Sequence, residues 1–456
     1  MNGPLSHRFR PSWLWRFVQG EDGMITVQNL FLTVAACAIG AAGLDVTSFF
    51  QARTELQVAA DVAAHSALYR RNQSSVTPTT ARTDAIARVQ YGMPSSRFGE
   101  VVDATDITFG TYNPASKTFT ANETSRQAAL AIAGRNEAGD NAVSSFLFRI
   151  VGIDQVDVRT EAVAVRYSPG CLTNGFAARN AVKITSGNQF FDDFCIHSNS
   201  RVELNNSNGF ETGVVVSMPN TNDLKMPSAG WTSNTGLVEA LREGQYDFQI
   251  LDRIATGNDL QVELRTMGTV DQEEFAPWLR YSTVNTVDKT TVTPADFTRP
   301  AGSVYSITSC GGKGLTLGPG TYQNMILTTD CSINMSGQVI LDQAIISTTS
   351  TDSKSVHANS GGGSSIQIGR YDTKCTPGGE AAIITRGGVD TSATLSMYGG
   401  QIIASGTVNF AAHLEGYGLS IVSGNEILGN TDIDAYGCPT TGMEQAIEGR
   451  YFRLAL

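Results

Sequence analysis

Charge and proline are both absent from residues 24–44, which read MITVQNLFLTVAACAIGAAGL. This run of about 20 residues is long enough to cross a hydrocarbon core of roughly 30 Å as a helix. No proline lies between Pro11 and Pro78, so nothing interrupts a helix that continues past Asp45. We therefore expect a single helix of about 45 residues, near 70 Å long, in which residues 24–71 form a transmembrane segment and a stalk.

The chain is also poor in charged residues, and it has no cluster of basic side chains. Charged residues make up 16% of the sequence and hydrophobic residues 41%, which fits a folded protein rather than a disordered one. The net charge of −11 and the lack of a Lys/Arg stripe exclude a nucleic-acid partner, because phosphate contacts need clustered Lys and Arg. The 456 residues allow two or three domains, and the 46 glycines favour turns and β-structure.

The basic residues before the apolar run predict its orientation. Arg8, Arg10 and Arg16 lie within the distance at which the positive-inside bias acts, and the neighbouring acidic residues weigh little in that rule. We expect residues 1–23 to form a cytoplasmic tail. Residues 45–456 would then lie on the other side of the membrane, in an oxidising compartment.

The seven cysteines form no C-x-x-C motif and no Cys/His cluster with zinc spacing, so we expect neither a metal nor a cofactor. Cys37 lies in the apolar run. The other six allow up to three disulfides in one of 15 pairings. Local pairing, the simplest choice, joins these pairs: Cys171–Cys195, Cys310–Cys331 and Cys375–Cys438. Each bond would contribute about 2–4 kcal/mol by restricting the unfolded chain. The alternative is six buried, reduced thiols.

The N-terminal segment has two alternative interpretations besides an uncleaved membrane anchor: a lipidated cysteine and a cleaved signal peptide. Val34-Ala35-Ala36-Cys37 is similar to a bacterial lipobox, and lipidation there would replace the span by acyl chains. However, residues 38–44 remain apolar, where a lipoprotein normally turns polar. A cleaved signal peptide is disfavoured by the length of the apolar run, which leads directly into a helix.

Residues 72–167 are predicted to form a small α+β domain that packs on the stalk. Helical spacing predicts helices at 83–91 and 140–150, and alternating polarity predicts strands at 106–112 and 156–167. A further apolar run at 127–134, rich in alanine, is predicted to be a strand. The stalk itself presents a face of small residues, which lets it approach a sheet or another helix closely.

A specific pattern surrounds the apolar run. Gly20-Glu21-Asp22-Gly23 precedes it, Gly43-Leu44-Asp45 ends it, and Arg53-x-x-Leu56-Gln57-x-Ala59-Ala60-Asp61-x-Ala63-Ala64 follows it. This pattern resembles the TadE/TadG-like Flp pilus-assembly family, most strongly over residues 15–72. The resemblance implies a bacterial inner-membrane protein whose periplasmic part works in or beside a tight-adherence pilus machine. It implies pilus-assembly proteins as partners of the stalk helix, and no catalytic residues. The motif residues are Gly23, Asp45, Arg53, Leu56, Gln57, Ala60 and Asp61.

Two features depart from relatives in that family. Some pilin-like members are cleaved after a glycine that has Glu five residues further on, whereas here Gly23 is followed at that position by Gln28. Glutamine costs less in lipid than a carboxylate, but it also weakens the cleavage signal. Larger members often carry a von Willebrand-type domain with an Asp-x-Ser-x-Ser metal motif, and that motif does not occur in this sequence.

The pattern of the sequence changes at Tyr167-Ser168-Pro169-Gly170. Beyond this point it consists of strand-like runs of four or five residues that are separated by Gly, Asn and Ser. Residues 168–456 are therefore predicted to form a right-handed parallel β-helix-like domain, in which short strands stack on their neighbours. The alternative is a β-sandwich, which requires longer and more regular alternation. Residues near 220–300 look helical and are predicted to be an insertion that caps or flanks the stack. The expected fold class is thus α+β plus all-β.

Few residues in this domain form a constellation that would support catalysis. Asp192 and Asp193 are adjacent, so in a strand they would point to opposite faces, and His197 nearby lacks the partners of a polysaccharide-cleaving site. A solvated turn is the interpretation that we favour. Asp432 and Asp434 open a calcium-like loop, but Glu444 lies one position beyond the bidentate ligand, which favours a polar turn.

These observations predict a non-catalytic, membrane-anchored structural component related to Tad (Flp) pilus biogenesis. Its partners would be the inner membrane and pilus-assembly proteins. The alternative is a cell-envelope β-helix protein that binds glycan or acts on polysaccharide.

Overall fold

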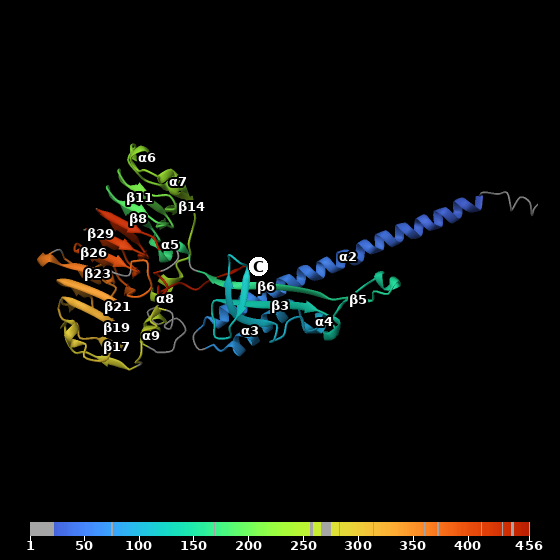
Figure 1. The fold of residues 1–456 in the computed structure, drawn as a ribbon, viewed down its shortest axis with the longest axis horizontal. Helices are drawn as coiled ribbons and strands as arrows, with labels where there is room; N and C mark the ends of the chain where they lie inside the picture. The colour runs from blue at the N-terminus through green and yellow to red at the C-terminus, as the bar shows by residue number, and fades with distance from the viewer. Residues whose placement is uncertain are drawn as a thin grey trace, which may run out of the picture. The chain divides into compact units, whose positions relative to one another are not determined.

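The computed structural model describes residues 22–73, 76–167, 169–255, 259–265, 275–281, 283–312, 314–359, 361–371, 374–411, 413–430, 432–438 and 442–455. The expected cytoplasmic tail, including Arg8, Arg10 and Arg16, lies outside these residues apart from Asp22 and Gly23. The chain divides into two compact units (Figure 1). The first contains the N-terminal helix, residues 76–165 and residues 452–455, and the second contains residues 166–451.

The first unit is built on α2 (Asp22–Arg71), a single helix of 50 residues. This confirms the prediction of one uninterrupted helix, and from Ile25 onward it is long and apolar enough to cross a membrane. Two helices follow, α3 (Pro78–Gly92) and the short α4 (Ser95–Phe98). Thr77 caps α3 by accepting a hydrogen bond from the Thr80 N–H, and Pro78 occupies the first turn, where its missing N–H costs nothing.

The second half of α2 packs on a five-stranded sheet, shown beside it in Figure 1. The strand order is β2 (Thr118–Ala121), β1 (Ile107–Asn113), β3 (Ala128–Arg135), β6 (Val158–Tyr167) and β33 (Tyr451–Leu454). The helix and the sheet meet through small side chains, with Ala60 and Ala64 of α2 in one core with Ala131 of β3 and Ala162 of β6. These alanines let the helix approach the sheet closely, so the small face of the stalk is used within the chain.

Three predicted strands are confirmed by β1, β3 and β6, but the predicted helix at 140–150 is wrong. After the 3-10 turn η1 (Glu137–Gly139), this region forms a narrow hairpin of β4 (Val143–Ser144), the 3-10 turn η2 (Phe148–Val151) and β5 (Gln155–Val156). Gly152 ends the turn with φ +88°, a conformation that favours glycine. The spacing of Val143, Phe146 and Leu147 is typical of a helix. Hydrogen bonds to residues distant in the sequence instead stabilise the hairpin. The C-terminal strand β33 was not expected in this unit.

The second unit is a β-helix of three parallel faces, which confirms the predicted architecture. Parallel pairing also excludes the alternative β-sandwich. Face 1, in stacking order, contains β15 (Val284–Thr286), β17 (Ser303–Ile307), the second halves of β19 (Gly320–Thr329) and β21 (Gln338–Thr348), then β24 (Ala381–Thr385), β27 (Gly400–Ala404), β30 (Ser420–Ser423), β7 (Gly175–Ala178), β10 (Cys195–Ser198), β13 (Val215–Met218) and β14 (Leu241–Glu243).

The other two faces follow the same order. Face 2 contains β16 (Thr291–Val292), β18 (Leu315–Leu317), β20 (Ile333–Met335), β22 (Val356–Ala358), β25 (Val389–Thr391), β28 (Val408–Phe410), β31 (Glu426–Gly429), β8 (Ala181–Ile184) and β11 (Arg201–Leu204). Face 3 contains the first halves of β19 (Gly320–Thr329) and β21 (Gln338–Thr348), then β23 (Ser365–Gly369), β26 (Thr394–Tyr398), β29 (Leu414–Tyr417), β32 (Ile433–Tyr436), β9 (Gln189–Phe191) and β12 (Gly209–Phe210).

The order of the coils in space differs from their order in the sequence. The first coil, with β7, stacks on β30 near the end of the chain, and β10 and β13 continue the stack beyond β7. The chain then returns to the opposite end and winds from β15 back toward β7. Figure 1 shows β14 and β11 at one end and β17 at the other. The chain therefore enters the stack in its interior.

The segment near 220–300 makes this return, and it flanks the stack. It holds η3 (Thr221–Asp223), α6 (Gly230–Ser233), α7 (Leu237–Ala240), α8 (Gln249–Ala255), α9 (Asp259–Arg265) and η4 (Pro294–Asp296). Phe248, Leu251 and Leu264 pack on the outward side chains of face 1, among them Ile345 and Ile403. Face 1 is therefore buried on both sides, which explains its runs of consecutive apolar residues.

Candidate functional site

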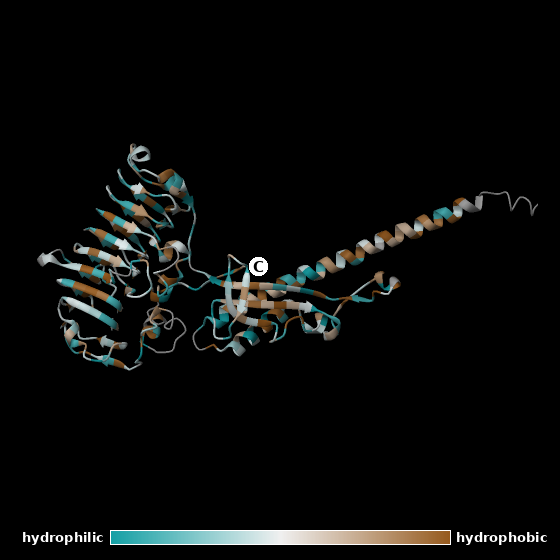
Figure 2. Ribbon diagram, in the orientation of Figure 1, coloured by the Kyte–Doolittle hydropathy of each residue, from teal (hydrophilic) through white to brown (hydrophobic). Residues whose placement is uncertain are grey.

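The first half of α2 exposes large apolar side chains on all sides. Phe31 is 72% exposed and Ile39 is 75% exposed, and Figure 2 shows this part of the helix coloured mainly in the hydrophobic range. The neighbouring side chains behave alike: Ile25, Val27, Leu30, Leu32, Val34 and Leu44. Cys37 is a free, exposed thiol within the same stretch. Soluble proteins rarely expose apolar surface of this extent, so the surface indicates a membrane or another apolar partner.

Asp45, one of the motif residues, is fully buried where the apolar run ends. Its carboxylate accepts hydrogen bonds from three consecutive backbone N–H groups of the β4–β5 hairpin: Phe146 at 2.6 Å, Leu147 at 2.8 Å and Phe148 at 2.7 Å. Burial alone would raise the pKa of Asp45, but these donors and Arg149 keep it below its usual value. Three successive N–H groups form a nest for an anion.

The remaining motif residues fix α2 on the sheet or lie at its surface. Leu56 and Ala60 are fully buried in the helix–sheet core. The Gln57 side chain donates to Asp61 Oδ1 at 3.0 Å and to the Glu161 carbonyl at 3.1 Å, which ties the helix to β6. Arg53 is exposed. Gly23 lies in the first turn of the helix.

One stripe of the stalk remains uncovered by the sheet. Phe50 is 63% exposed, Val58 is 57% exposed and Val62 is 36% exposed. We call these three residues the stalk stripe. Positions 50, 58 and 62 fall within about one third of the helix circumference at 3.6 residues per turn, so they lie on one side of the helix. The stripe offers an apolar contact surface next to the exposed first half of α2.

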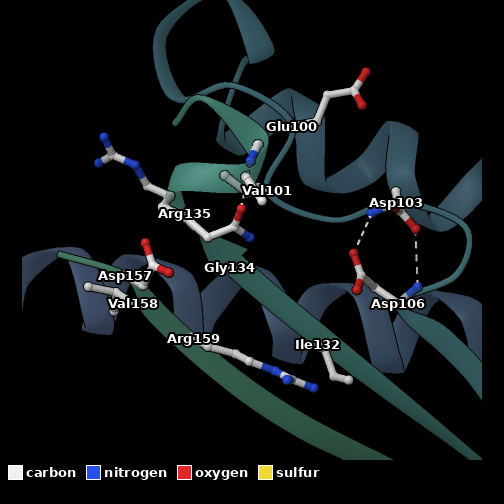
Figure 3. Close-up of a pocket in the computed structure, with 13 residues that line it drawn as sticks. Glu100, Val101, Asp103, Asp106, Ile132, Gly134, Arg135, Asp157, Val158 and Arg159 are labelled. Carbon is white, nitrogen blue, oxygen red and sulfur yellow. Dashed lines mark hydrogen bonds between the residues drawn. The ribbon is translucent and has the colours of Figure 1, made fainter. Parts of the chain in front are cut away.

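A polar pocket of about 790 Å³ opens at one end of the sheet in the first unit. Figure 3 shows Asp103 and Asp106 linked by two hydrogen bonds, with Arg159 nearby. Hydrogen bonds from Thr105 lower the pKa of Asp103, and burial raises the pKa of Asp106. The two acids close a tight turn. The described residues that line the pocket include four carboxylates, Glu100, Asp103, Asp106 and Asp157, and two guanidinium groups, Arg135 and Arg159, but no histidine, cysteine, serine or lysine.

The residues of the second unit that were considered as catalytic have different environments. Asp192 and Asp193 are exposed in a turn, and both adopt positive φ. His197 is fully buried, stacked on Tyr246 with ring centroids 4.1 Å apart. Its Nδ1 lies 2.7 Å from Ser217 Oγ, and burial lowers its pKa. This histidine supports the packing of the return segment on face 1.

The calcium-like stretch does not gather its carboxylates into one site. Asp432 lies in an exposed turn and contacts His413 Nδ1 at 3.1 Å. Asp434 points outward from face 3 in register with Glu415. Glu444 instead accepts a hydrogen bond from the Gly442 N–H at 2.8 Å. Each group has its own local environment, as a polar turn requires.

The structure joins the same three cysteine pairs that local pairing gave: Cys171–Cys195, Cys310–Cys331 and Cys375–Cys438. Asp330 lies beside the second pair, close enough to resemble a metal cluster. Because both sulfurs belong to a disulfide, they are not available as ligands, and one carboxylate alone does not make a metal site.

An aromatic column on face 3 was missed by the sequence reasoning. Tyr417 and Tyr436 stack with ring centroids 4.2 Å apart, Phe191 stacks on Tyr436 at 4.5 Å, and Tyr398 precedes Tyr417. Lys374 lies 4.5 Å from the Tyr417 ring centroid. The three tyrosines recur at a constant spacing in the sequence, one per coil, and that period was the signal that could have revealed them.

The larger part of the second unit, residues 175–439, matches a family described as a domain of unknown function, DUF7867. The chain belongs to this family. Residues 23–73, which include all seven motif residues, match the TadE/G-like Flp pilus-assembly family, and this confirms the resemblance seen in the sequence. No curated protein and no solved structure matches the chain. The Tad domain implies association with pilus-assembly machinery. Together with the apolar helix and the disulfides, it indicates an envelope-anchored protein.

Proposed function

We propose that this chain is a single-pass inner-membrane protein that acts as a structural component of Tad (Flp) pilus assembly. The first half of α2 spans the bilayer, residues 1–23 lie in the cytoplasm, and both compact units lie in the periplasm. The observation that carries this proposal is the coincidence of the Tad match at 23–73 with a helix that is apolar and exposed in its first half. Three disulfides in the distal unit fit an oxidising compartment.

The stalk stripe is the surface through which we propose that pilus-assembly proteins bind. The alanine face of α2 is occupied by the chain's own sheet, so it is not open to a partner helix. Val58 and Val62 remain exposed on the opposite side. An apolar stripe of this kind fits a second amphipathic or membrane-anchored helix.

A photo-crosslinking amino acid at Val58 or Val62, in cells that carry the pilus system, tests the proposal. We expect covalent adducts with Tad pilus-assembly proteins from both positions. The matched control is Lys117, which is exposed in the turn between β1 and β2 and should give no such adduct. Recovery of the full-length chain in the soluble cytoplasmic fraction, or equal adducts from all three positions, would refute the proposal.

We also propose that the protein is not an enzyme. The adjacent pair Asp192 and Asp193, the candidate catalytic acids of the sequence, supports this proposal, because both residues are exposed in a turn. Hydrolysis of a glycosidic bond needs two carboxyl groups on either side of the bond. Turnover of peptidoglycan or of other envelope polysaccharides by the purified protein, lost on replacement of Asp192 and Asp193, would contradict the proposal.

Glycan binding is a second candidate function, favoured by the aromatic column of face 3. Because Tyr417 and Tyr436 stack on each other, they offer ring edges and hydroxyl groups rather than open faces. A sugar would therefore be held mainly by hydrogen bonds, with Glu415 and Asp434 alongside. Binding of cell-wall polymer that is lost in Tyr417→Ala and Tyr436→Ala supports this candidate. Unchanged binding in both variants removes it.

A further inference from the structure

The β4–β5 hairpin exposes three large apolar side chains at its turn. Phe146 is 63% exposed, Ile150 is 77% exposed and Ile153 is 45% exposed. Among the described residues of the first unit outside α2, the other large apolar side chains of this kind are Tyr91 and Leu454, and these two lie apart from the hairpin in the sequence. Figure 2 shows hydrophobic colouring at the end of this hairpin, beside α2. The exposed apolar surface of the unit is therefore concentrated on α2 and on this turn.

The hairpin lies at a defined level of α2. Asp45 binds the N–H groups of Phe146, Leu147 and Phe148, and the ring of Phe148 lies 6.1 Å from that of Phe49. Asp45 directly follows the uncharged run, so the hairpin turn is fixed where the apolar half of the helix ends.

The contact between Asp45 and the hairpin also buries the one charged side chain that would otherwise lie on the apolar surface of the helix. Asp45 is the sole charged residue of α2 between Ile25 and Phe50, and the hairpin covers it completely. The next exposed charge is Arg53. A charge-free helix surface of 26 residues measures about 39 Å, which exceeds a hydrocarbon core of roughly 30 Å. The surplus of about 9 Å matches the depth of the interfacial layer.

We propose that the turn of this hairpin, residues 146–153, enters the interfacial layer of the membrane that α2 crosses. This inference rests on the proposed membrane anchoring. Phe146, Ile150 and Ile153 contact the acyl boundary, and the lipid surface is thus continuous from the helix onto the turn. Arg149, exposed among these apolar residues, reaches lipid phosphate while its stem stays in the apolar layer.

The function of such a contact is to fix the periplasmic unit on the bilayer at a second point. A single helix can rotate and tilt in lipid, since tilt is set by neighbouring contacts and interfacial anchors. A second contact displaced from the helix axis restricts both motions. The orientation of the stalk stripe relative to the membrane plane is then fixed before a partner binds.

The test uses the full-length protein in vesicles of phosphatidylethanolamine and phosphatidylglycerol, with Cys37→Ser to remove the free thiol. An environment-sensitive fluorophore is attached at Ile150→Cys, at Phe31→Cys and at Tyr91→Cys. We expect lipid-attached nitroxide to quench the probes at 31 and 150, and aqueous iodide to quench the probe at 91. Asp45→Asn should release the hairpin, raising iodide quenching at 150 by about tenfold while position 31 is unchanged.

The outcomes separate this inference from the anchoring that it rests on. Iodide quenching at 150 equal to that at 91, with position 31 still in lipid, would overturn the hairpin contact alone. Iodide quenching at 31 would overturn membrane anchoring and the inference with it. Protection of position 150 in cells but not in pure lipid vesicles would identify a protein as the occupant and would also overturn the lipid contact.

Discussion

Ile421 lies in register with Phe176 in neighbouring parallel strands, although the two residues belong to the last and the first coils of the domain. Both side chains are fully buried in the same core. The pairing closes the β-helix between its two sequence ends, so that the coils formed early and late in the chain stabilise each other.

This pairing predicts energetic coupling between the two residues. Phe176→Ala should lower the free energy of unfolding by about 3–5 kcal/mol and Ile421→Ala by about 2–5 kcal/mol, because each leaves a cavity. A double-mutant cycle in chemical denaturation should give a coupling of about 0.5–3 kcal/mol. The control pair Ile421 and Ile333, several coils apart, should be additive. Additivity of the first pair would contradict the order of the coils.

A buried ion pair fastens the return segment to the C-terminal part of the second unit. Glu263 of α9 is 4% exposed, and it contacts Arg253 of α8 and Arg450, the latter at 2.8 Å. Glu263→Gln should cost about 3–5 kcal/mol, because it leaves two guanidinium groups without their carboxylate. The measurement is thermal unfolding with limited proteolysis at 249–265. Glu239→Gln, at an exposed site, should change stability by less than about 0.5 kcal/mol.

The buried histidine predicts a pH dependence of the second unit. The Asn199 side-chain amide donates to the Tyr246 carbonyl and accepts from the Tyr246 N–H, so the Asn199 Oδ1 that faces His197 Nε2 accepts a hydrogen bond from it. His197 Nδ1 lies 2.7 Å from the Ser217 hydroxyl. Burial of the ring disfavours its charged form, and this lowers the pKa of His197. Because the pKa of His197 is lower in the folded state, the ring takes up a proton at higher pH in the unfolded state than in the folded state. The free energy of unfolding of the second unit should therefore fall as the pH drops below about 6.5.

Equilibrium unfolding between neutral and mildly acidic pH measures this effect. His197→Gln should remove this part of the slope, whereas Ser217→Ala keeps the titrating group and should keep it. An unchanged slope in His197→Gln would assign the pH dependence to another group.

The contact between Asp45 and the hairpin predicts a loss of stability in the same direction, on acidification, but in a more acidic range. Because its folded pKa is lowered, the stabilisation is complete above the unfolded value near 3.9 and is lost as the pH falls through the folded pKa. Asp45→Asn should reduce the hydrogen-exchange protection of residues 146–148 by about tenfold at neutral pH. Asp154→Asn, at an exposed position of the same hairpin, should leave their protection unchanged. Equal protection in both variants would count against the contact.

The disulfides predict a loss of stability on reduction. Cys310→Ser opens a link between residues 21 positions apart and should cost about 2–5 kcal/mol. Non-reducing peptide mapping of protein isolated from cells should recover the three pairs of the structure. Cys37→Ser, which removes a free thiol, is the control and should not change the unfolding of the distal unit. Recovery of six free thiols would place the distal unit in a reducing compartment.

Several features of this protein could be predicted because they depend on residues that are close in the sequence. The absence of charge from 24–44 specifies the apolar helix, and the small residues from Leu56 to Ala67 specify its packing face. Cysteines one coil apart, such as Cys310 and Cys331, are brought together by the stacking of neighbouring coils. Short strands with glycine between them specify a stack rather than a sandwich.

The errors and omissions share a different cause, which is contact over a long stretch of chain. The periodicity at 140–150 suggested a helix, but the backbone N–H groups at 146–148 bind Asp45 instead of forming helical hydrogen bonds. The strand β33 completes a sheet whose other members lie before residue 168. The aromatic column was visible as a period, yet only stacking of the coils brings Tyr417 against Tyr436.

The sequence by itself determined an anchored helix with a Tad motif and a distal stack of short strands, because local polarity and spacing fix both. Only the tertiary structure decided where the chain enters that stack, which face of α2 stays open and which donors receive the Asp45 carboxylate. Backbone hydrogen bonds carry no side-chain signature, so residues distant in the chain can pair without any mark in the pattern of either segment.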